Sequence, residues 1–154
     1  MYLLFTMQLE NADNISKGRL VLIDEQQGIL GRWVATSGLP NDQEVGDWSK
    51  PQGGEIPPTY QLESELPFYQ VETKPVDLRS LKGVEGNAYP ILPNQVITKD
   101  GVSRSDLMIH RDANVPGSLG CIVLEGVEEF ADFETTLAKY AKEDTIKLLV
   151  VYTY

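Results

Sequence analysis

The residues best suited to chemistry are the only histidine, His110, and the only cysteine, Cys121. A cysteine attacks a carbonyl as its thiolate, and an adjacent imidazole both removes the thiol proton and stabilises the anion as an ion pair. Gly120 lets the main chain approach a substrate closely, and the amide of Cys121 is suited to donate to an oxyanion on the attacked carbonyl. These residues predict acyl transfer through a cysteine nucleophile, with His110 as its base.

The same two residues also have a structural interpretation. A lone cysteine is often a small buried hydrophobic residue, and a lone histidine is often a satisfied structural residue. Asp112 is close enough in sequence to orient the His110 ring, and Asn114 competes with it for that role. One cysteine and one histidine are too few for an internal disulfide or a zinc site of the usual four ligands, so we expect no metal and no cofactor.

Short apolar segments on both sides of a turn-rich loop must position this pair. Leu107-Met108-Ile109 predicts a strand that ends at His110, and Cys121-Ile122-Val123-Leu124 predicts a strand that begins at Cys121. Apolar residues spaced by three and four between Gly126 and Glu143 predict a single long amphipathic helix. Residues 145–154 are β-branched and aromatic and predict a final strand in the centre of a sheet.

The N-terminal half predicts an antiparallel meander followed by a long loop. The three strands of the meander are expected at residues 2–9, 19–24 and 29–36, with turn-forming residues between them. Residues 37–58 have the composition of an ordered loop, which a buried Trp48 would hold in place. The remaining predictions are a strand at 59–63, irregular structure at 65–86 with a helical turn near 77–82, and an edge or bulged strand at 89–98 because of its prolines.

Length and composition indicate one soluble domain that covers residues 1–154. The formal net charge of −10 excludes an electrostatic nucleic-acid binder, because binding phosphates requires clustered Lys and Arg. The first residues lack a basic region and a cleavage site, and no apolar stretch approaches the roughly 20 residues of a spanning helix. We therefore expect no signal peptide and no membrane insertion, and a protein that is cytoplasmic as made.

The segment Ser118-Leu119-Gly120-Cys121-Ile122, which follows an aliphatic strand with a histidine, resembles the site of L,D-transpeptidases of the YkuD type. The sequences WVATSG at residues 33–38 and GGEIPPTY at residues 53–60 are similar to the Ser-Gly and Pro-x-Gly region of that family. The resemblance implies a mainly β domain, a mixed β-sandwich or twisted sheet with one C-terminal amphipathic helix before a final strand. It also implies that Cys121 is the nucleophile, His110 the general base, Ser118 a polar neighbour of the thiol and Gly120 part of the oxyanion site.

The chain departs from the family pattern at the positions that anchor substrate. Arg111 stands where the family usually has glycine, Leu119 where it has a second histidine, and Val123 and Leu124 where an arginine or asparagine follows the cysteine. We expect Arg111 or Arg104 to supply the missing carboxylate contact, because a guanidinium suits that geometry. Further substrate contacts are predicted at Asn114, Trp48 and Tyr60.

The resemblance implies a reaction on the stem peptides of bacterial peptidoglycan. Cys121 would form an acyl-enzyme next to a D-amino acid, which an amine resolves in a transpeptidase and water resolves in a carboxypeptidase or endopeptidase. Because this substrate lies outside the membrane, delivery by a phage, a secretion system or lysis would be needed. The alternatives are a non-catalytic structural or virion-associated module of the same fold and a cysteine amidase or peptidase of ordinary peptides.

Overall fold

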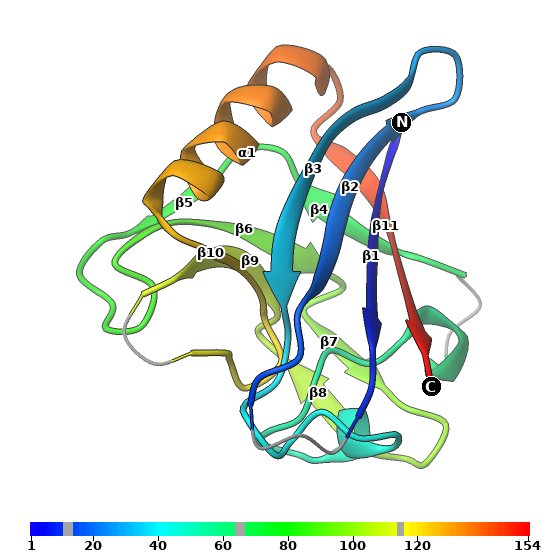
Figure 1. Cartoon of the computed structure of the whole chain (residues 1–154). Coiled ribbons are helices and arrows are strands. Elements are labelled where there is room, and N and C mark those ends of the chain that lie inside the picture. The colour runs from blue at the N-terminus through cyan, green and yellow to red at the C-terminus, as the bar shows by residue number, and fades with distance from the viewer. Residues whose placement is uncertain (11–13, 64–66, 114–115) are drawn as a thin grey trace.

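The structure, a computed structural model, describes residues 1–10, 14–63, 67–113 and 116–154 (Figure 1). Strands dominate these residues, and one α-helix lies near the C-terminal end. The elements in chain order are β1 (Tyr2–Gln8), β2 (Gly18–Asp24), β3 (Gly28–Thr36), the 3-10 helices η1 (Asp47–Ser49) and η2 (Thr59–Gln61), β4 (Tyr69–Glu72), β5 (Val76–Leu78), β6 (Gly86–Leu92), β7 (Gln95–Ile97), β8 (Ser103–Ser105), β9 (Met108–Asp112), β10 (Ile122–Glu125), α1 (Val127–Tyr140) and β11 (Thr145–Thr153).

Nine strands form one mixed sheet in the order β4-β11-β1-β2-β3-β10-β9-β6-β5, and β7 pairs with β8 separately. β1 runs parallel to β11 and β9 runs parallel to β10, whereas the other paired strands are antiparallel. Because β4 pairs with β6 as well as with β11, the sheet curls and closes on itself through the strands from β4 to β6. This confirms the predicted mainly β fold with a twisted mixed sheet, one helix and a final strand.

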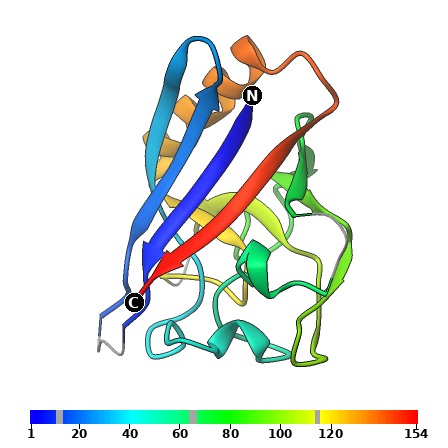
Figure 2. The same cartoon turned by 90° about the vertical axis from the view of Figure 1, so that its right-hand side faces the viewer.

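The predicted N-terminal meander is confirmed. β1 pairs antiparallel with β2, and β2 with β3. Leu3, Phe5 and Met7 alternate with more exposed residues along β1, as expected for a strand with one face on a core. The final strand lies between β1 and β4, which confirms its predicted central position, and Figure 2 shows it beside β1.

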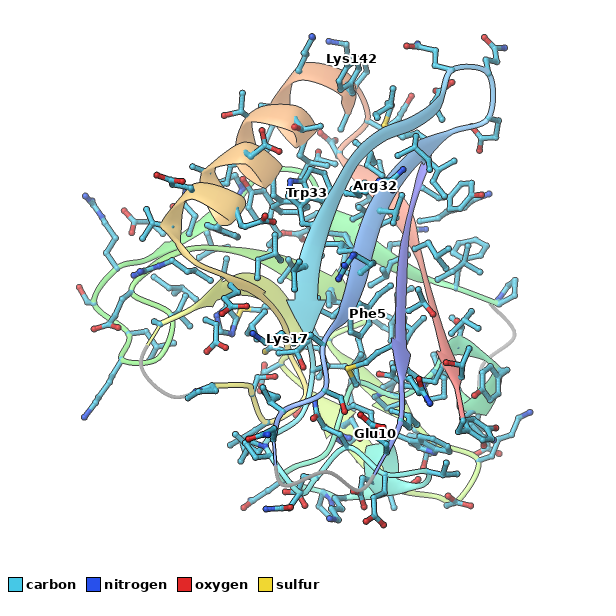
Figure 3. The ribbon with its side chains drawn as sticks, in the orientation of Figure 1. Phe5, Glu10, Lys17, Arg32, Trp33 and Lys142 are labelled. Carbon is cyan, nitrogen blue, oxygen red and sulfur yellow. The ribbon has the colours of Figure 1, made fainter. Side chains whose placement is uncertain are left out.

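Helix α1 contributes its apolar stripe to the core inside the curled sheet. Phe130, Phe133 and Leu137 are buried, as their spacing predicts. The Phe133 ring packs edge-on against both Trp33 of β3 and Tyr89 of β6, with centroids 5.1 and 5.3 Å away, so it joins two distant strands of the sheet. Trp33 extends from β3 toward the helix (Figure 3), where its indole N–H donates to Asp132 Oδ2 at 2.7 Å.

Two predictions for the middle of the chain are wrong. Residues 59–61 form the 3-10 helix η2, because the preceding Pro57 and Pro58 cannot donate to a ladder and the Pro58 carbonyl accepts from Gln61 N instead. Residues 69–72 and 76–78 form β4 and β5 in place of an irregular stretch, and β5 is followed by a turn in which Leu81 N donates to Leu78 O at 3.0 Å, close to the predicted helical turn.

Strand β6 is paired on both sides, although a proline lies within it. Pro90 faces Met108 of β9 on one side. On the other side, the pairing with β5 stops at Ala88 and that with β4 begins at Ile91, so Pro90 stands where no ladder bond is required. The predicted edge position is therefore wrong for the strand as a whole, and it holds only for Pro90 on the side of β4 and β5.

Candidate functional site

His110 is the third residue of β9, and its side chain is 7% exposed. The strand continues to Asp112, so the prediction that it ends at the histidine is wrong. The His110 Nδ1 atom lies 2.7 Å from the carbonyl oxygen of Arg111, which only accepts hydrogen bonds. Nδ1 therefore carries the proton in the neutral ring, and Nε2 is left with a free lone pair.

Burial lowers the pKa of the His110 imidazole, and the Arg111 carbonyl and the charge of Asp112 oppose this effect only in part. The ring is thus neutral at physiological pH, with Nε2 able to accept a proton. Asp112 is not needed to fix this tautomer, because the main chain of Arg111 does so, and Asn114, the other predicted partner, lies outside the described residues. The sequence contains no signal for this contact, since every residue carries a carbonyl.

Cys121 directly precedes β10 and is partly exposed. Its thiol lies 3.8 Å from the carbonyl oxygen of Asp106, to which it donates. Desolvation raises the pKa of the thiol to about 11, although the Met108 amide and the charge of Arg104 favour the thiolate. The resting pair is therefore a neutral thiol and a neutral imidazole, which differs from the ion pair that the sequence predicted.

The parallel register of β9 and β10 brings the two side chains to one face of the sheet. Ile109 pairs with Ile122 and His110 pairs with Val123. Both isoleucines are fully buried in the core, so His110 and the residues flanking Ile122 lie on the outer face. Among the described residues the thiol donates to the Asp106 carbonyl and has no hydrogen bond to the imidazole, so a proton transfer to His110 requires the thiol to leave the Asp106 carbonyl.

The main chain before the cysteine is held by the polar residues around it. Ser118 donates its hydroxyl to the Cys121 carbonyl, and its amide donates to Gly38 O at 3.0 Å. Gly120 has a φ of +121°, and a Cβ at this position would lie 2.3 Å from Arg104 Nη2. Only glycine fits here, both for its backbone conformation and for the closeness of the guanidinium.

The Arg104 guanidinium is an internal support of the site. It is 2% exposed and donates to the carbonyls of Trp48, Glu55 and Leu119. These bonds connect the loop at residues 37–58 to the segment that ends in Cys121. A side chain engaged in this way does not face a substrate, so the alternative anchoring role expected for Arg104 is wrong.

The predicted substrate contacts do not gather around the thiol. Arg111 leaves β9 on the side opposite to His110 and reaches the Glu85 carbonyl at 3.4 Å. The Trp48 ring is buried in the core and stacks on Tyr152, with centroids 6.4 Å apart. Their positions give them no direct path to a substrate carbonyl at Cys121.

Tyr60 lies in η2 beside the C-terminal strand, and it is 40% exposed. Burial, together with a hydrogen bond to Tyr154, raises the pKa of its phenol to about 12. Asn114, for which we also predicted a substrate contact, lies outside the described residues. Arg111, Trp48 and Tyr60 do not lie together in the structure, and their contacts with a substrate remain predictions.

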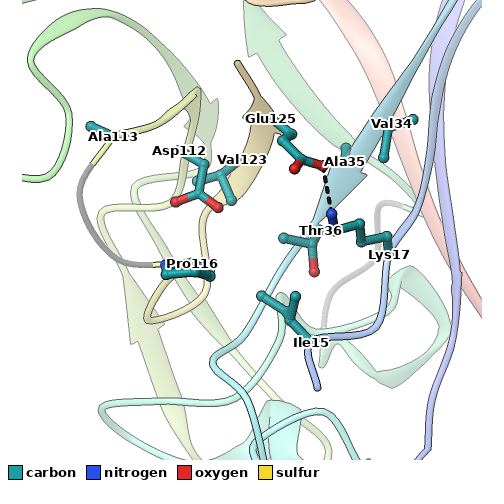
Figure 4. A pocket seen from close by; sticks show the side chains of 10 residues that line it. All are labelled: Ile15, Lys17, Val34, Ala35, Thr36, Asp112, Ala113, Pro116, Val123 and Glu125. Atoms are coloured by element: carbon teal, nitrogen blue, oxygen red, sulfur yellow. Dashed lines mark hydrogen bonds and ion pairs between the residues drawn. The ribbon is translucent and has the colours of Figure 1, made fainter.

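A cavity of about 300 Å³ opens on the outer face of the sheet (Figure 4). Val123, the partner of His110, lines it, and so does Asp112, two residues further along β9. Lys17 forms an ion pair with Glu125 across the cavity at 2.6 Å. The other lining residues are Ile15, Val34, Ala35, Thr36, Ala113 and Pro116.

Asp112 links this cavity to the loop that carries the cysteine. Its Oδ2 accepts a hydrogen bond from Gly117 N at 3.0 Å, and desolvation raises the pKa of its carboxyl group. It thus anchors the loop between His110 and Cys121 and contributes its charge to the imidazole from a distance. Neither His110 nor Cys121 is among the residues that line this cavity, which contains groups of both charge signs and is connected to the pair through Val123 and Asp112.

Among the described residues, no cluster of three or more His, Cys, Asp and Glu side chains is placed to bind a metal ion. The same residues include no helix of the length and apolarity that crossing a membrane requires. Comparisons of the chain with protein-family models, curated proteins and solved structures found no match.

Proposed function

We propose that this protein is a cysteine acyl transferase of the L,D-transpeptidase type that acts on peptidoglycan stem peptides. The observation that carries the proposal is the hydrogen bond from His110 Nδ1 to the Arg111 carbonyl. It leaves Nε2 as a proton acceptor on the same sheet face as Cys121, and Val123, the pairing partner of His110, lines a cavity on that face. The sequence Ser118-Leu119-Gly120-Cys121 supplies the resemblance to the family.

The neutral resting pair favours general-base catalysis over a preformed thiolate. The thiol rotates away from the Asp106 carbonyl, and Nε2 of His110 takes its proton as sulfur bonds to the substrate carbonyl carbon. The Cys121 amide donates to the resulting oxyanion. When the carbonyl reforms, the C–N bond breaks and the leaving amine takes the proton from His110.

The second half of the reaction releases the acyl group from sulfur. An amine or a water molecule loses its proton to Nε2 while it attacks the thioester, and the thiol is regenerated. The first acceptor gives a cross-link or an exchanged terminal residue, and the second gives hydrolysis. The choice depends on whether the acceptor amine reaches the site before water does.

The cavity lined by Val123, the pairing partner of His110, suits a stem peptide. A lysine and two carboxylates, Asp112 and Glu125, share it with apolar side chains. Stem peptides carry ammonium and carboxylate groups on short aliphatic chains, so both signs of charge and an apolar wall would contribute to binding.

A non-catalytic module of the same fold is the second candidate. Its supporting observation is the burial that raises the pKa of Cys121 to about 11, since a structural cysteine is inert for this reason. In such a module, His110 would be dispensable and the thiol would react only on unfolding.

The test is incubation with a stem tetrapeptide that ends in a D-amino acid, and with the same peptide in all-L form. Intact mass detects the acyl adduct on Cys121, and chromatography detects the released amino acid. We expect an adduct with the first peptide only, none in Cys121→Ser, and acylation slowed about 100-fold or more in His110→Ala. Because its pKa is lowered, His110 should support acylation at pH values below about 6.5, the ordinary imidazole value.

Other outcomes of this experiment decide between the candidates. Equal cleavage of both peptides would make the protein an amidase of ordinary peptides. No adduct with either peptide, combined with iodoacetamide labelling only after unfolding, would favour the structural module and overturn the proposal.

A further inference from the structure

Ser37 directly follows β3 and is completely buried, and its hydroxyl contacts the peptide unit before the candidate nucleophile. The Ser37 hydroxyl donates to the carbonyl oxygen of Gly120 at 3.1 Å. The Ser37 hydroxyl oxygen in turn accepts a hydrogen bond from the amide of Ile56 at 2.8 Å. With one donor and one acceptor bound, the hydroxyl has a fixed orientation.

This contact determines the direction of the Cys121 amide. The Gly120 carbonyl and the Cys121 N–H belong to one planar trans peptide unit, so they point to opposite sides of the chain. With the carbonyl held by Ser37 inside the protein, the N–H is directed away from Ser37. No main-chain acceptor for this N–H occurs in the part of the chain that the structure describes.

The left-handed conformation of Gly120 makes such a restraint necessary. Its φ of +121° belongs to a region that glycine enters without steric cost, so the peptide unit has other conformations close in energy. On the other side of the cysteine, Ser118 holds the Cys121 carbonyl. The two serines therefore fix the peptide units before and after the nucleophile.

We infer that Ser37 is a positioning residue that aims the Cys121 N–H at the oxyanion formed during acylation. This inference rests on the proposed function, because it requires a carbonyl substrate at Cys121. Ser37 itself is 0% exposed and touches no substrate. Its contribution is to hold the Cys121 N–H in place before the reaction. A donor that is already oriented stabilises the oxyanion without the cost of reorganisation.

Two reactions of the same thiol separate this role from a structural one. Acylation by p-nitrophenyl acetate passes through an oxyanion, whereas alkylation by iodoacetamide is a displacement at a saturated carbon without one. We expect Ser37→Ala to slow acylation by about 10- to 100-fold, because a misdirected amide loses most of the effect of one oxyanion donor. Alkylation should stay within about twofold, since the thiol and His110 are unchanged.

Thr59→Val is the matched control for this variant. The Thr59 hydroxyl is also buried, donates to the Val150 carbonyl at 2.9 Å and accepts from Val150 N at 3.0 Å. Thr59→Val thus loses one donated and one accepted main-chain hydrogen bond, as Ser37→Ala does, but at a position remote from the cysteine. We expect it to unfold at a lower temperature but to keep the acylation-to-alkylation ratio of the natural protein.

Ser37→Thr keeps the hydroxyl and should recover most of the acylation rate if Ser37→Ala proves poorly folded. If the natural protein is acylated, two results for Ser37→Ala would overturn the role of Ser37 alone. They are an equal slowing of acylation and alkylation, and an unchanged rate of acylation. Failure of the natural protein to be acylated at all would overturn the proposed function and this inference together.

Discussion

The two ends of the loop at residues 37–58 bury polar groups in opposite ways. At the first end, Gln43 accepts from Ser16 N at 2.7 Å, and its amide donates to Thr36 Oγ1 and to Ser37 O at 2.8 and 2.9 Å. At the second end, Trp48 Nε1 and both carboxylate oxygens of Glu55 have no partner among the residues that the structure describes. Both ends lie below the surface.

The difference shows which end sets the geometry of the site. Fully bonded groups such as Ser37 have one orientation, and they lie next to the peptide unit before Cys121. The second end avoids an unpaired charge by protonation, since burial raises the pKa of Glu55 to about 8. Arg104, which donates to carbonyls of the second end and of the cysteine loop, connects the two regions.

Replacing the connecting residue should have the largest effect. Arg104→Leu leaves three internal carbonyls without their donor, so we expect the free energy of unfolding to fall by about 4 kcal/mol. Urea unfolding followed by tryptophan fluorescence measures it. Arg79→Leu, on an exposed ion pair with Asp77, is the control and should barely change stability. Equal effects would show that Arg104 does not connect the two ends.

Gln43→Leu tests the fully bonded end. It leaves Ser16 N and Ser37 O unsatisfied in the interior, and we expect a loss of about 3 kcal/mol in unfolding free energy. Acylation of Cys121 should also slow, because Ser37 loses a restraint. Gln52→Leu, at an exposed position of the same loop, controls for the change of side chain. A stable, fully active Gln43→Leu protein would contradict the importance of this end.

Glu55→Gln tests the unpaired end through pH. Because the folded-state pKa is raised, the folded protein holds a proton that the unfolded chain releases, so stability declines as the pH rises from about 4.5 to about 8. We expect a decline of about 2 kcal/mol, less than the full shift implies, because local opening hydrates the carboxylate. Glu55→Gln should remove this decline, whereas the exposed Glu63→Gln should retain it. A natural protein with flat stability over this range would show that Glu55 is paired or hydrated.

The smallest effect is expected at Trp48. Trp48→Phe loses ring volume in the core but no described hydrogen bond, so we expect the free energy of unfolding to fall by about 1 kcal/mol. Trp33→Phe loses a similar volume and also the bond to Asp132, so it should cost about 2 kcal/mol. Differential scanning calorimetry resolves the two variants. The reverse order would mean that Trp48 has a partner that the described residues do not include.

The sequence predicted the elements whose pattern is local. The spacing of Phe130, Phe133 and Leu137 is enough to predict α1, and alternation in residues 2–8 is enough for β1. It failed at residues 59–61, where consecutive prolines outweigh strand composition, and at β4 and β5, whose short segments become strands only by pairing with β11 and β6.

The candidate site divides in the same way. His110 and Cys121 were found by their chemistry, and Gly120 and Ser118 by their place beside the cysteine. The Arg111 carbonyl, the Asp106 carbonyl and Ser37 were missed, because their roles come from main-chain direction and from a contact between residues far apart in the sequence. The predicted ion pair with His110 requires a low pKa of the Cys121 thiol. Burial in the folded chain raises this pKa instead, and the sequence does not show that burial.

The parallel pairing of β1 with β11 has a consequence for how the chain folds. Tyr2 pairs with Lys147 and Gln8 with Thr153, so this ladder forms only after most of the chain has been synthesised. Until then β1 and β4 each expose an edge that β11 later fills, and such edges promote association between chains. Closing so long a loop before the contacts form also costs entropy, so slow folding is expected for this topology.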